Sequence, residues 1–488
     1  MLELCEDYRE NVRRADEALR VNENFDVIKK ILYIGKQELT LYYIDGFVDG
    51  GSMNKLMIYF LSLKGLGNPE NNAPDAAARY FCEHHVPYVE AEITDSGEKM
   101  MQMVLSGTSL ILGETFGAYA IVIDSRTYPT RSVDEPESDR VMMGSRDGFV
   151  ETLVFNTALI RRRVRDPSLT MQYFTVGSRS KSDVVLCYLN GQADPGYVRF
   201  LQDRLRSIQT GALTMGHESL AELLIRDKWY NPFPKIRYTE RPDVAAAQVL
   251  EGSVLVVIDN SPEVMIFPST AFDFMQETND FYFPPLTGSY IRLVRHLVFW
   301  ATLFLVPVWF FFTQNPDITP TWLTFVLPES SGKIPIFAQL LLVEFMIDGL
   351  RMASMNTPNM LSNSLSVVGG LILGDFAVGI GWLIPEVILY MAFVAIANFS
   401  QRSYQLGYAF KFLRIGLLVC IQLFGWVGFL IGGLGCIVLL ATNKTANGKR
   451  SYLYPLIPFH GKALYSMFFR MRKDKFPNTN GIRRAPKR

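Results

Sequence analysis

Cysteine and histidine are scarce in this sequence, with five of each among 488 residues. The cysteines are odd in number, show no C-x-x-C spacing, and include two, Cys420 and Cys436, that lie in an apolar stretch. This usage argues against a disulfide framework and favours a reduced cytoplasmic setting. Cys82 precedes His84 and His85, but no second pair at the spacing of zinc ligands accompanies them. We therefore expect no metal site.

Motifs of catalysis and nucleotide binding are missing too. Gly46, Gly50 and Gly51 lie close together, but they match neither G-x-G-x-x-G nor a P-loop. No nucleophile elbow is present, and no combination of Ser, His and Asp suggests a catalytic triad. The sequence therefore predicts a protein that is not an enzyme and holds no cofactor.

A secretory signal is also lacking. The first ten residues, MLELCEDYRE, are acidic and contain no apolar core. Nothing in them would direct export, so we expect the N-terminal part to stay in the cytoplasm.

Net charge is zero, with 48 basic and 48 acidic side chains and a mean hydropathy of +0.13. The zero conceals a division, because residues 1–290 carry 29 Lys/Arg against 41 Asp/Glu, and the remainder carries 19 against 7. The net charge therefore averages two parts of the chain that are expected to lie in different surroundings. A wholly soluble enzyme, a disordered chain and a general nucleic-acid binder do not fit this division.

Three consecutive arginines, Arg161, Arg162 and Arg163, form a cation cluster near the end of a predicted helix. A phosphate or nucleic-acid site would need more than this local cluster. We expect salt bridges to the acidic half of the chain or to a neighbouring subunit, and no nucleic-acid partner.

Five apolar stretches follow residue 290 and predict a membrane domain. They are residues 293–312, 334–352, 365–384, 387–399 and 416–441. The fourth has only 13 residues, and the fifth has 26 and could tilt, or bend at Gly432 and Gly433.

Basic residues give the expected orientation. Arg402, Lys411 and Arg414 lie between the last two stretches, and the chain beyond residue 441 has 12 basic residues and one acid. Both termini are then cytoplasmic, which requires an even number of crossings. We expect four spans and one re-entrant or interfacial piece. Residues 455–476 mix aromatic and basic side chains, which predicts a helix on an anionic lipid surface, with a solvated basic tail as the alternative.

The first half repeats itself at an offset of 145 residues. Residues 41–46 align with 186–191, and residues 104–107 with 249–252. Each repeat, about 24–131 and 144–284, is expected to contain a helix, two strands, a turn, a helix, a further helix and a hairpin. The continuous apolar run 184–189 predicts a buried strand.

The expected fold is an α/β soluble head of two similar tandem subdomains followed by an α-helical polytopic membrane domain. The expected boundaries are 1–140 and 141–288 for the subdomains, 289–442 for the membrane domain and 443–488 for a basic cytoplasmic tail.

Several motifs make the sequence similar to a known family. They are GSRDGFVETL from Gly144, NTALIRRR from Asn156, GSRSKSD from Gly177, NPFPKIRYTERPD from Asn231, YFPP from Tyr282 and SVVGGLILG from Ser366. Over nearly the whole chain these residues resemble the GerA family of spore germination A-subunits. Asp375 follows Gly374 where nutrient-receptor members would have Gln, so the likeness points to another branch of the family.

The resemblance implies an inner-membrane protein of bacterial endospores that acts in germination with other spore membrane proteins. It also implies a homo-oligomeric channel that releases ions from the spore core. A non-conducting scaffold that assembles germination complexes stays open as the alternative. A secondary transporter is disfavoured, because the spans show no repeat while the head does.

Charged residues within the apolar stretches are the first candidate site. Glu344, Asp348 and Arg351 recur at i, i+4 and i+7 and so share one helix face. Arg351 can pair with Asp348 while its end reaches the cytoplasmic headgroups. The cluster predicts a pore vestibule or partner contact, and a charge cluster at the membrane rim is the alternative.

Asp375 lies near the middle of the third stretch and is the second candidate. In a ring of subunits it would place carboxylates at mid-membrane, where they attract cations. Leu365, Val368, Leu371 and Ile372 could form an apolar constriction beside it. The helix-packing candidates are Gly369, Gly370 and Gly374. An ordinary spanning helix with a buried Asp375 is the alternative.

Overall fold

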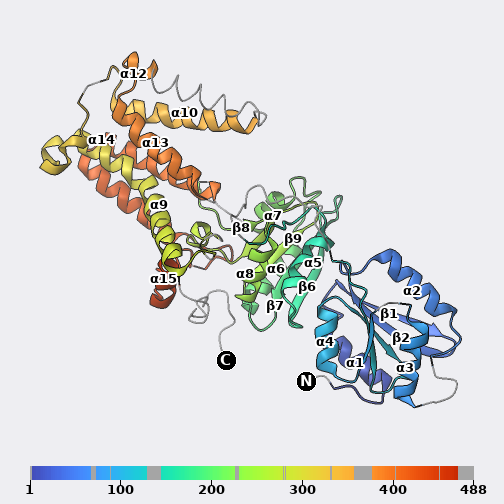
Figure 1. Cartoon of the computed structure of the whole chain (residues 1–488). Coiled ribbons are helices and arrows are strands. Elements are labelled where there is room, and N and C mark those ends of the chain that lie inside the picture. The colour runs from blue at the N-terminus through green and yellow to red at the C-terminus, as the bar shows by residue number, and fades with distance from the viewer. Residues whose placement is uncertain are drawn as a thin grey trace. The chain divides into compact units, whose positions relative to one another are not determined.

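The computed structural model describes residues 3–66, 73–87, 90–128, 144–225, 230–277, 280, 282–329, 332–356, 376–401, 403–449 and 451–470. These residues form two compact units (Figure 1). One, here called the head, comprises the described residues of 1–227 and 236–268. The other, here called the helical unit, comprises those of 228–235 and 269–477.

The head contains the same succession of elements twice. The first copy is α1 (Tyr8–Leu19), β1 (Val27–Ile34), β2 (Gln37–Ile44), α2 (Gly50–Ser62), α3 (Pro74–His85), β3 (Ala91–Thr94), α4 (Gly97–Leu105), β4 (Ser109–Gly113) and β5 (Ala120–Ile123). The second is α5 (Leu153–Arg163), β6 (Leu169–Val176), β7 (Ser182–Leu189), α6 (Pro195–Ser207), α7 (His217–Leu224), β8 (Arg237–Thr239), α8 (Pro242–Leu250), β9 (Val254–Ile258) and β10 (Val264–Phe267).

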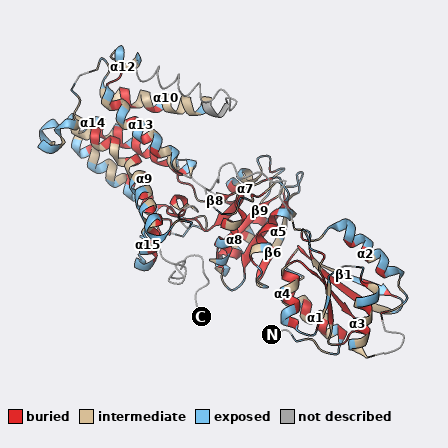
Figure 2. Ribbon diagram, in the orientation of Figure 1, coloured by how far each residue is buried: buried red, intermediate tan, exposed pale blue. Residues whose placement is uncertain are grey.

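The two sheets have equivalent strand orders, β1-β2-β4-β5-β3 and β6-β7-β9-β10-β8, with antiparallel neighbours throughout. The strand β7 predicted from the run 184–189 is confirmed, and these six residues are buried. Figure 2 shows the same burial in the central strands of both sheets. The sequence did not predict β3 and β8, because four and three residues are too few to display an alternating pattern.

The first repeat begins closer to the N-terminus than residue 24, where the alignment of the two halves of the head placed its start. Asn11 of α1 is buried, donates to the carbonyl of Cys5 at 2.7 Å and accepts from its N–H at 2.8 Å. Asn156 of α5 forms the same two bonds with Val150, and both residues are again 145 positions further along the chain. Each amide thus fastens the segment that precedes the first helix of its repeat.

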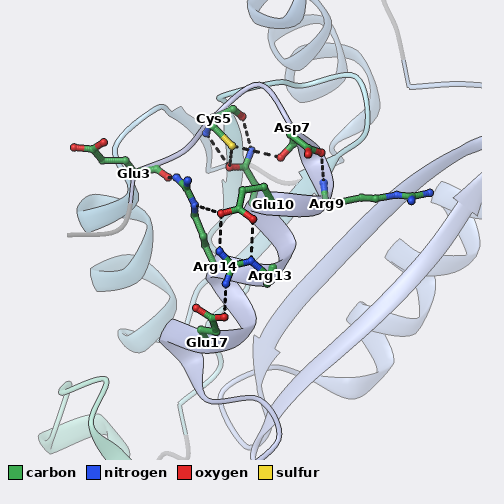
Figure 3. Close-up of polar contacts among 9 residues, drawn as sticks. Glu3, Cys5, Asp7, Arg9, Glu10, Arg13, Arg14 and Glu17 are labelled. Atoms are coloured by element: carbon green, nitrogen blue, oxygen red, sulfur yellow. Dashed lines mark hydrogen bonds and ion pairs between the residues drawn. The ribbon is translucent and has the colours of Figure 1, made fainter.

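The outer face of α1 is charged, in contrast. Glu10 lies between Arg13 and Arg14 and bonds to both guanidinium groups (Figure 3). These hydrogen bonds lower the pKa of Glu10 to about 2. Because the group is on the surface, the contacts contribute little to stability.

A buried ion pair joins the two repeats within the head. Arg161 of α5 bonds to Asp26 through Nε, and through Nη2 to Oδ1 at 2.9 Å, and each side chain is 1 % exposed. Two hydrogen bonds to the backbone of Met171, in the edge strand β6, also link the repeats. Phe25 N–H donates to the Met171 carbonyl, and Met171 N–H donates to the side-chain oxygen Oδ1 of Asn24. Arg163 also pairs with Asp147, so two arginines of the cluster form salt bridges, as expected.

Two equivalent turns allow a matched test of this junction. Gly46 and Gly191 follow β2 and β7 with φ of 81° and 82°, values that favour glycine. A Cβ on Gly46 would lie 2.9 Å from the Cβ of Ala158 in α5, but one on Gly191 would meet nothing within 4 Å. Gly191→Ala should therefore cost about 1–2 kcal/mol from backbone strain alone. Gly46→Ala should cost more, as measured by denaturant unfolding, and equal losses would contradict a tight junction.

The helical unit begins with the 3-10 turn η1 (Asp273–Met275). Its other elements are α9 (Pro285–Gln314), η3 (Pro316–Ile318), η4 (Thr321–Val326), α10 (Ile336–Asn356), α12 (Ala377–Gly379), α13 (Pro385–Phe399), α14 (Tyr404–Thr442) and α15 (Gly461–Phe468). By length and composition, α9 and α14 could each cross a membrane, and α13 is a shorter apolar helix.

The longest helix, α14, is broken at Gly425, whose φ of 56° and ψ of −130° are not helical. The two arms fold back on each other: a Cβ on Gly428 would lie 1.9 Å from the carbonyl oxygen of Cys420. A Cβ on Gly432 would lie 2.7 Å from Leu417. The chain therefore turns at Gly425 and not at Gly432 and Gly433, where a bend was one of two alternatives. Gly432 instead allows the close packing of the two arms.

Candidate functional site

Five charged side chains converge between α10 and the first arm of α14. Helix α10 supplies Glu344, Asp348 and Arg351, whose spacing places them on one face as predicted. The first arm of α14 supplies Lys411 and Arg414. The contacts follow the order 344 with 414 and 348 with 411, so the two helices run in opposite directions.

Glu344 and Arg414 form the buried centre of this charge cluster. Arg414 Nε donates to Glu344 Oε1 at 2.7 Å, and Arg414 Nη1 donates to the carbonyl of Thr302 in α9 at 2.6 Å. The side chains of Glu344 and Arg414 are only 5 % and 1 % exposed. An ion pair this deep requires both partners, because either charge alone would be desolvated without compensation.

Lys411 connects the two carboxylates. Its Nζ forms an ion pair with Asp348, lies 3.5 Å from Glu344 Oε2 and donates to the Glu344 carbonyl at 3.3 Å. Among the described residues, the ion-pair partner of Asp348 is Lys411 and not Arg351. The pairing predicted between Arg351 and Asp348 was therefore wrong.

Arg351 instead lies among aromatic rings. Its Cζ is 4.7 Å from the ring centre of Tyr404 and 5.3 Å from those of Phe399 and Tyr408. Stacking on rings suits the planar, weakly hydrated guanidinium group. The cluster as a whole carries three cations and two carboxylates.

Lys411 and Arg414 were expected in a loop before an apolar helix beginning at residue 416. The structure places both inside α14, which begins at Tyr404 with the side chain of Ser403 as its N-cap. The expected membrane orientation was based on counting basic residues in loops. Lys411 and Arg414 were counted as loop residues, so their ion pairs with α10 were not predicted. Their separation by three positions among apolar neighbours was the signal that could have identified a buried helix face.

A small, partly open pocket adjoins the cluster. It is lined by Glu344, Ile347, Asp348, Arg351, Val394, Ala395, Asn398, Phe399, Gly407, Tyr408, Lys411 and Arg414. The amide oxygen of Asn398 is buried there and accepts no hydrogen bond from the described residues. The pocket therefore brings charged and amide groups together with apolar side chains between α10, α13 and α14.

The second candidate set lies outside the described residues. It comprises the pore-lining candidates Leu365, Val368, Leu371, Ile372 and Asp375 and the helix-packing candidates Gly369, Gly370 and Gly374. The charge cluster and these positions occupy consecutive parts of the chain, because α10 ends at Asn356.

The comparisons with known proteins cover almost the whole chain. The family model described as Bacillus/Clostridium GerA spore germination protein matches residues 17–480. The chain belongs to the GerA family. Its likeness to this family, predicted from the motifs, is thereby confirmed, and it is a spore germination protein.

Individual relatives agree with this assignment. Stage V sporulation protein AF of Bacillus subtilis (strain 168) is 37 % identical over 450 residues, which cover 92 % of this chain and 90 % of the relative. Spore germination protein KA of Bacillus subtilis (strain 168) is 27 % identical, covering 94 % of this chain and 83 % of the relative.

A solved structure of the N-terminal domain of the A subunit of the Bacillus megaterium spore germinant receptor GerK3 is also similar. It has 23 % identity and a TM-score of 0.40, and it covers 54 % of this chain and 96 % of that domain.

Proposed function

We propose that this GerA-family protein is an oligomeric channel, or a subunit of one, that lets ions leave the spore core during germination. The observation that carries the proposal is the buried charge cluster within an apolar helical unit. Ionisable side chains inside membrane segments are costly, and they commonly mark ion pathways. The pair Glu344–Arg414 gives the helical unit such a feature.

The internal contacts of the helical unit support a membrane-spanning arrangement. The first arm of α14 runs parallel to α9, since Phe299 packs on Phe410 with ring centres 4.2 Å apart and Gln314 bonds to Gln422. Its second arm, α10 and α13 run the opposite way. The outer surface of the α14 hairpin is apolar and exposed, as lipid contact requires. Its exposed residues include Leu423, Phe424, Trp426, Leu430, Ile431 and Leu434.

Two contacts place residues at the two ends of the helical unit. Residue 351 lies at the end where α14 begins, and Gly381 lies at the other end, where its carbonyl accepts from Lys333 N–H near the start of α10. An even number of crossings would keep both termini on the cytoplasmic side, facing the spore core.

The charge cluster would then lie deep in the membrane. Thr302, which Arg414 contacts, is nine residues beyond Leu293, where the first apolar stretch starts. At 1.5 Å per residue this is about 14 Å, close to half the roughly 30 Å hydrocarbon core. The cluster holds α10 against α9 and α14, and α10 leads directly to the proposed pore segment with Asp375.

Partners belong to the same proposal. We propose that the chain forms a homo-oligomer in the inner spore membrane and acts with other germination membrane proteins. The C-terminal part would rest on anionic lipid, since α15 and its flanks expose Phe459, Lys462, Tyr465 and Phe469. No catalytic step forms part of the proposal.

Cation release from protein-loaded vesicles tests the proposed pathway. Asp375→Ala should reduce the rate of release at least about tenfold, because a mid-membrane carboxylate lowers the barrier for cations. Asp317→Ala, in the exposed turn η3, is the matched control and should leave release unchanged. Unchanged release by assembled Asp375→Ala protein would contradict a cation path through this residue.

A further inference from the structure

The guanidinium group of Arg351 differs from the four other charged groups of the cluster, which form ion pairs with one another. Within the described residues it has no ion-pair or hydrogen-bond partner, and only the rings of Phe399, Tyr404 and Tyr408 fix its position. Aromatic stacking orients the planar group and leaves its five N–H donors free.

The surroundings of Arg351 leave an excess of positive charge. Glu344 is neutralised by Arg414, and Asp348 by Lys411. Arg351 adds one uncompensated cation to a pocket that already holds these pairs. An anion is therefore the ligand that this pocket favours, and a planar donor fork suits the paired oxygens of a phosphate group.

In the membrane arrangement proposed above, on which this inference rests, Arg351 lies at the depth of the lipid headgroups. Phe410 packs on Phe299, and Tyr404 is six residues nearer the start of α14. At 1.5 Å per residue this is about 9 Å towards the cytoplasmic end, which reaches the level of Leu293 at the start of the apolar stretch. Phe399 and Tyr404 are 61 % and 58 % exposed, so the site is open to lipid at the depth where aromatic side chains gather.

We propose that Arg351, with the pocket between α10, α13 and α14, binds the phosphate group of an anionic phospholipid from the cytoplasmic leaflet. Basic pockets between membrane helices on this side are suited to anionic headgroups. The aromatic rings would face the start of the acyl chains, and the guanidinium fork would donate to two phosphate oxygens. This site is distinct from the surface around α15, which lies at the base of α9.

The test uses the purified full-length chain in detergent, titrated with phosphatidylglycerol, phosphatidylcholine or inorganic phosphate, with bound lipid counted by native mass spectrometry. Phosphatidylglycerol should bind more tightly than phosphatidylcholine. Arg351→Gln should weaken phosphatidylglycerol binding about fivefold, the effect of one basic residue at an anionic surface. Arg351→Lys should weaken it less, because the charge remains but the fork is lost.

Arg206→Gln is the matched control, since Arg206 also lies over a ring, that of Phe174 in the head. It should bind lipid as the unaltered chain does. Equal binding of both lipids would overturn the proposal. So would full affinity of Arg351→Gln together with lost affinity of Lys462→Gln, because the lipid would then bind at the surface around α15. Displacement of the lipid by millimolar inorganic phosphate would also overturn it and identify a free-anion site. Because binding is read without ion flux, its failure is separate from a failure of the proposed channel.

Discussion

Arg414→Met is expected to lower the free energy of unfolding of the helical unit by about 3–5 kcal/mol. The substitution removes the partner of Glu344, whose side chain is 5 % exposed, and leaves that carboxylate with the more distant Lys411 at 3.5 Å. It also leaves the Thr302 carbonyl without its contact from α14. Unfolding of the full-length chain in detergent, followed by circular dichroism against denaturant or temperature, measures the loss.

Two further variants make this result specific. Lys444→Met alters an exposed lysine of the same unit and should change stability by less than about 0.5 kcal/mol. The double variant Glu344→Leu with Arg414→Met replaces both charges with apolar groups and should recover most of the loss, because no unpaired charge stays buried. A loss below about 1 kcal/mol for Arg414→Met alone would show that water reaches the pair.

Asp26→Ala is expected to destabilise the head by a similar amount, about 3–5 kcal/mol. Arg161 is 1 % exposed and bonds to both oxygens of this one carboxylate, so the substitution would bury an uncompensated guanidinium group between the two repeats. Because the pair joins the repeats, the unfolding of the head should also become less cooperative, with one repeat unfolding before the other.

Asp203→Ala in α6 is the matched control, since Asp203 is exposed on the surface of the second repeat. It should leave both the midpoint and the cooperativity of unfolding unchanged. If Asp26→Ala unfolds in the same single transition as the unaltered chain, the repeats are held together chiefly by their apolar contacts and the backbone bonds at Met171.

The head could be predicted from sequence where a signal was local. The apolar run of residues 184–189 predicted the buried strand β7, because every residue of it faces a packed surface. The short strands β3 and β8 carry no such signal, because their pairing with β5 and β10 depends on contacts far apart in the chain. The ion pair between Arg161 and Asp26 could not be predicted either, because the fold and not the sequence spacing brings this one of many acidic residues to Arg161.

The charge cluster was predictable in part. The spacing of Glu344, Asp348 and Arg351 fixed a common helix face, whatever the helix packed against. The partners could not be derived in that way, because Lys411 and Arg414 are more than 60 residues away along the chain. The turn at Gly425 could not be predicted for another reason. Several glycines lie in α14, and only their packing distinguishes a glycine that turns the chain from one that allows two arms to approach closely.

Release of a trapped monovalent cation from vesicles that hold the full-length chain tests the central claim most directly. It should be measured for the chain alone and for the chain copurified with its membrane partners. If the chain conducts ions through the helical unit, release should be at least about tenfold faster than from protein-free vesicles in one of the two preparations. Release no faster than from protein-free vesicles in both preparations would contradict an ion-conducting role and favour a scaffold.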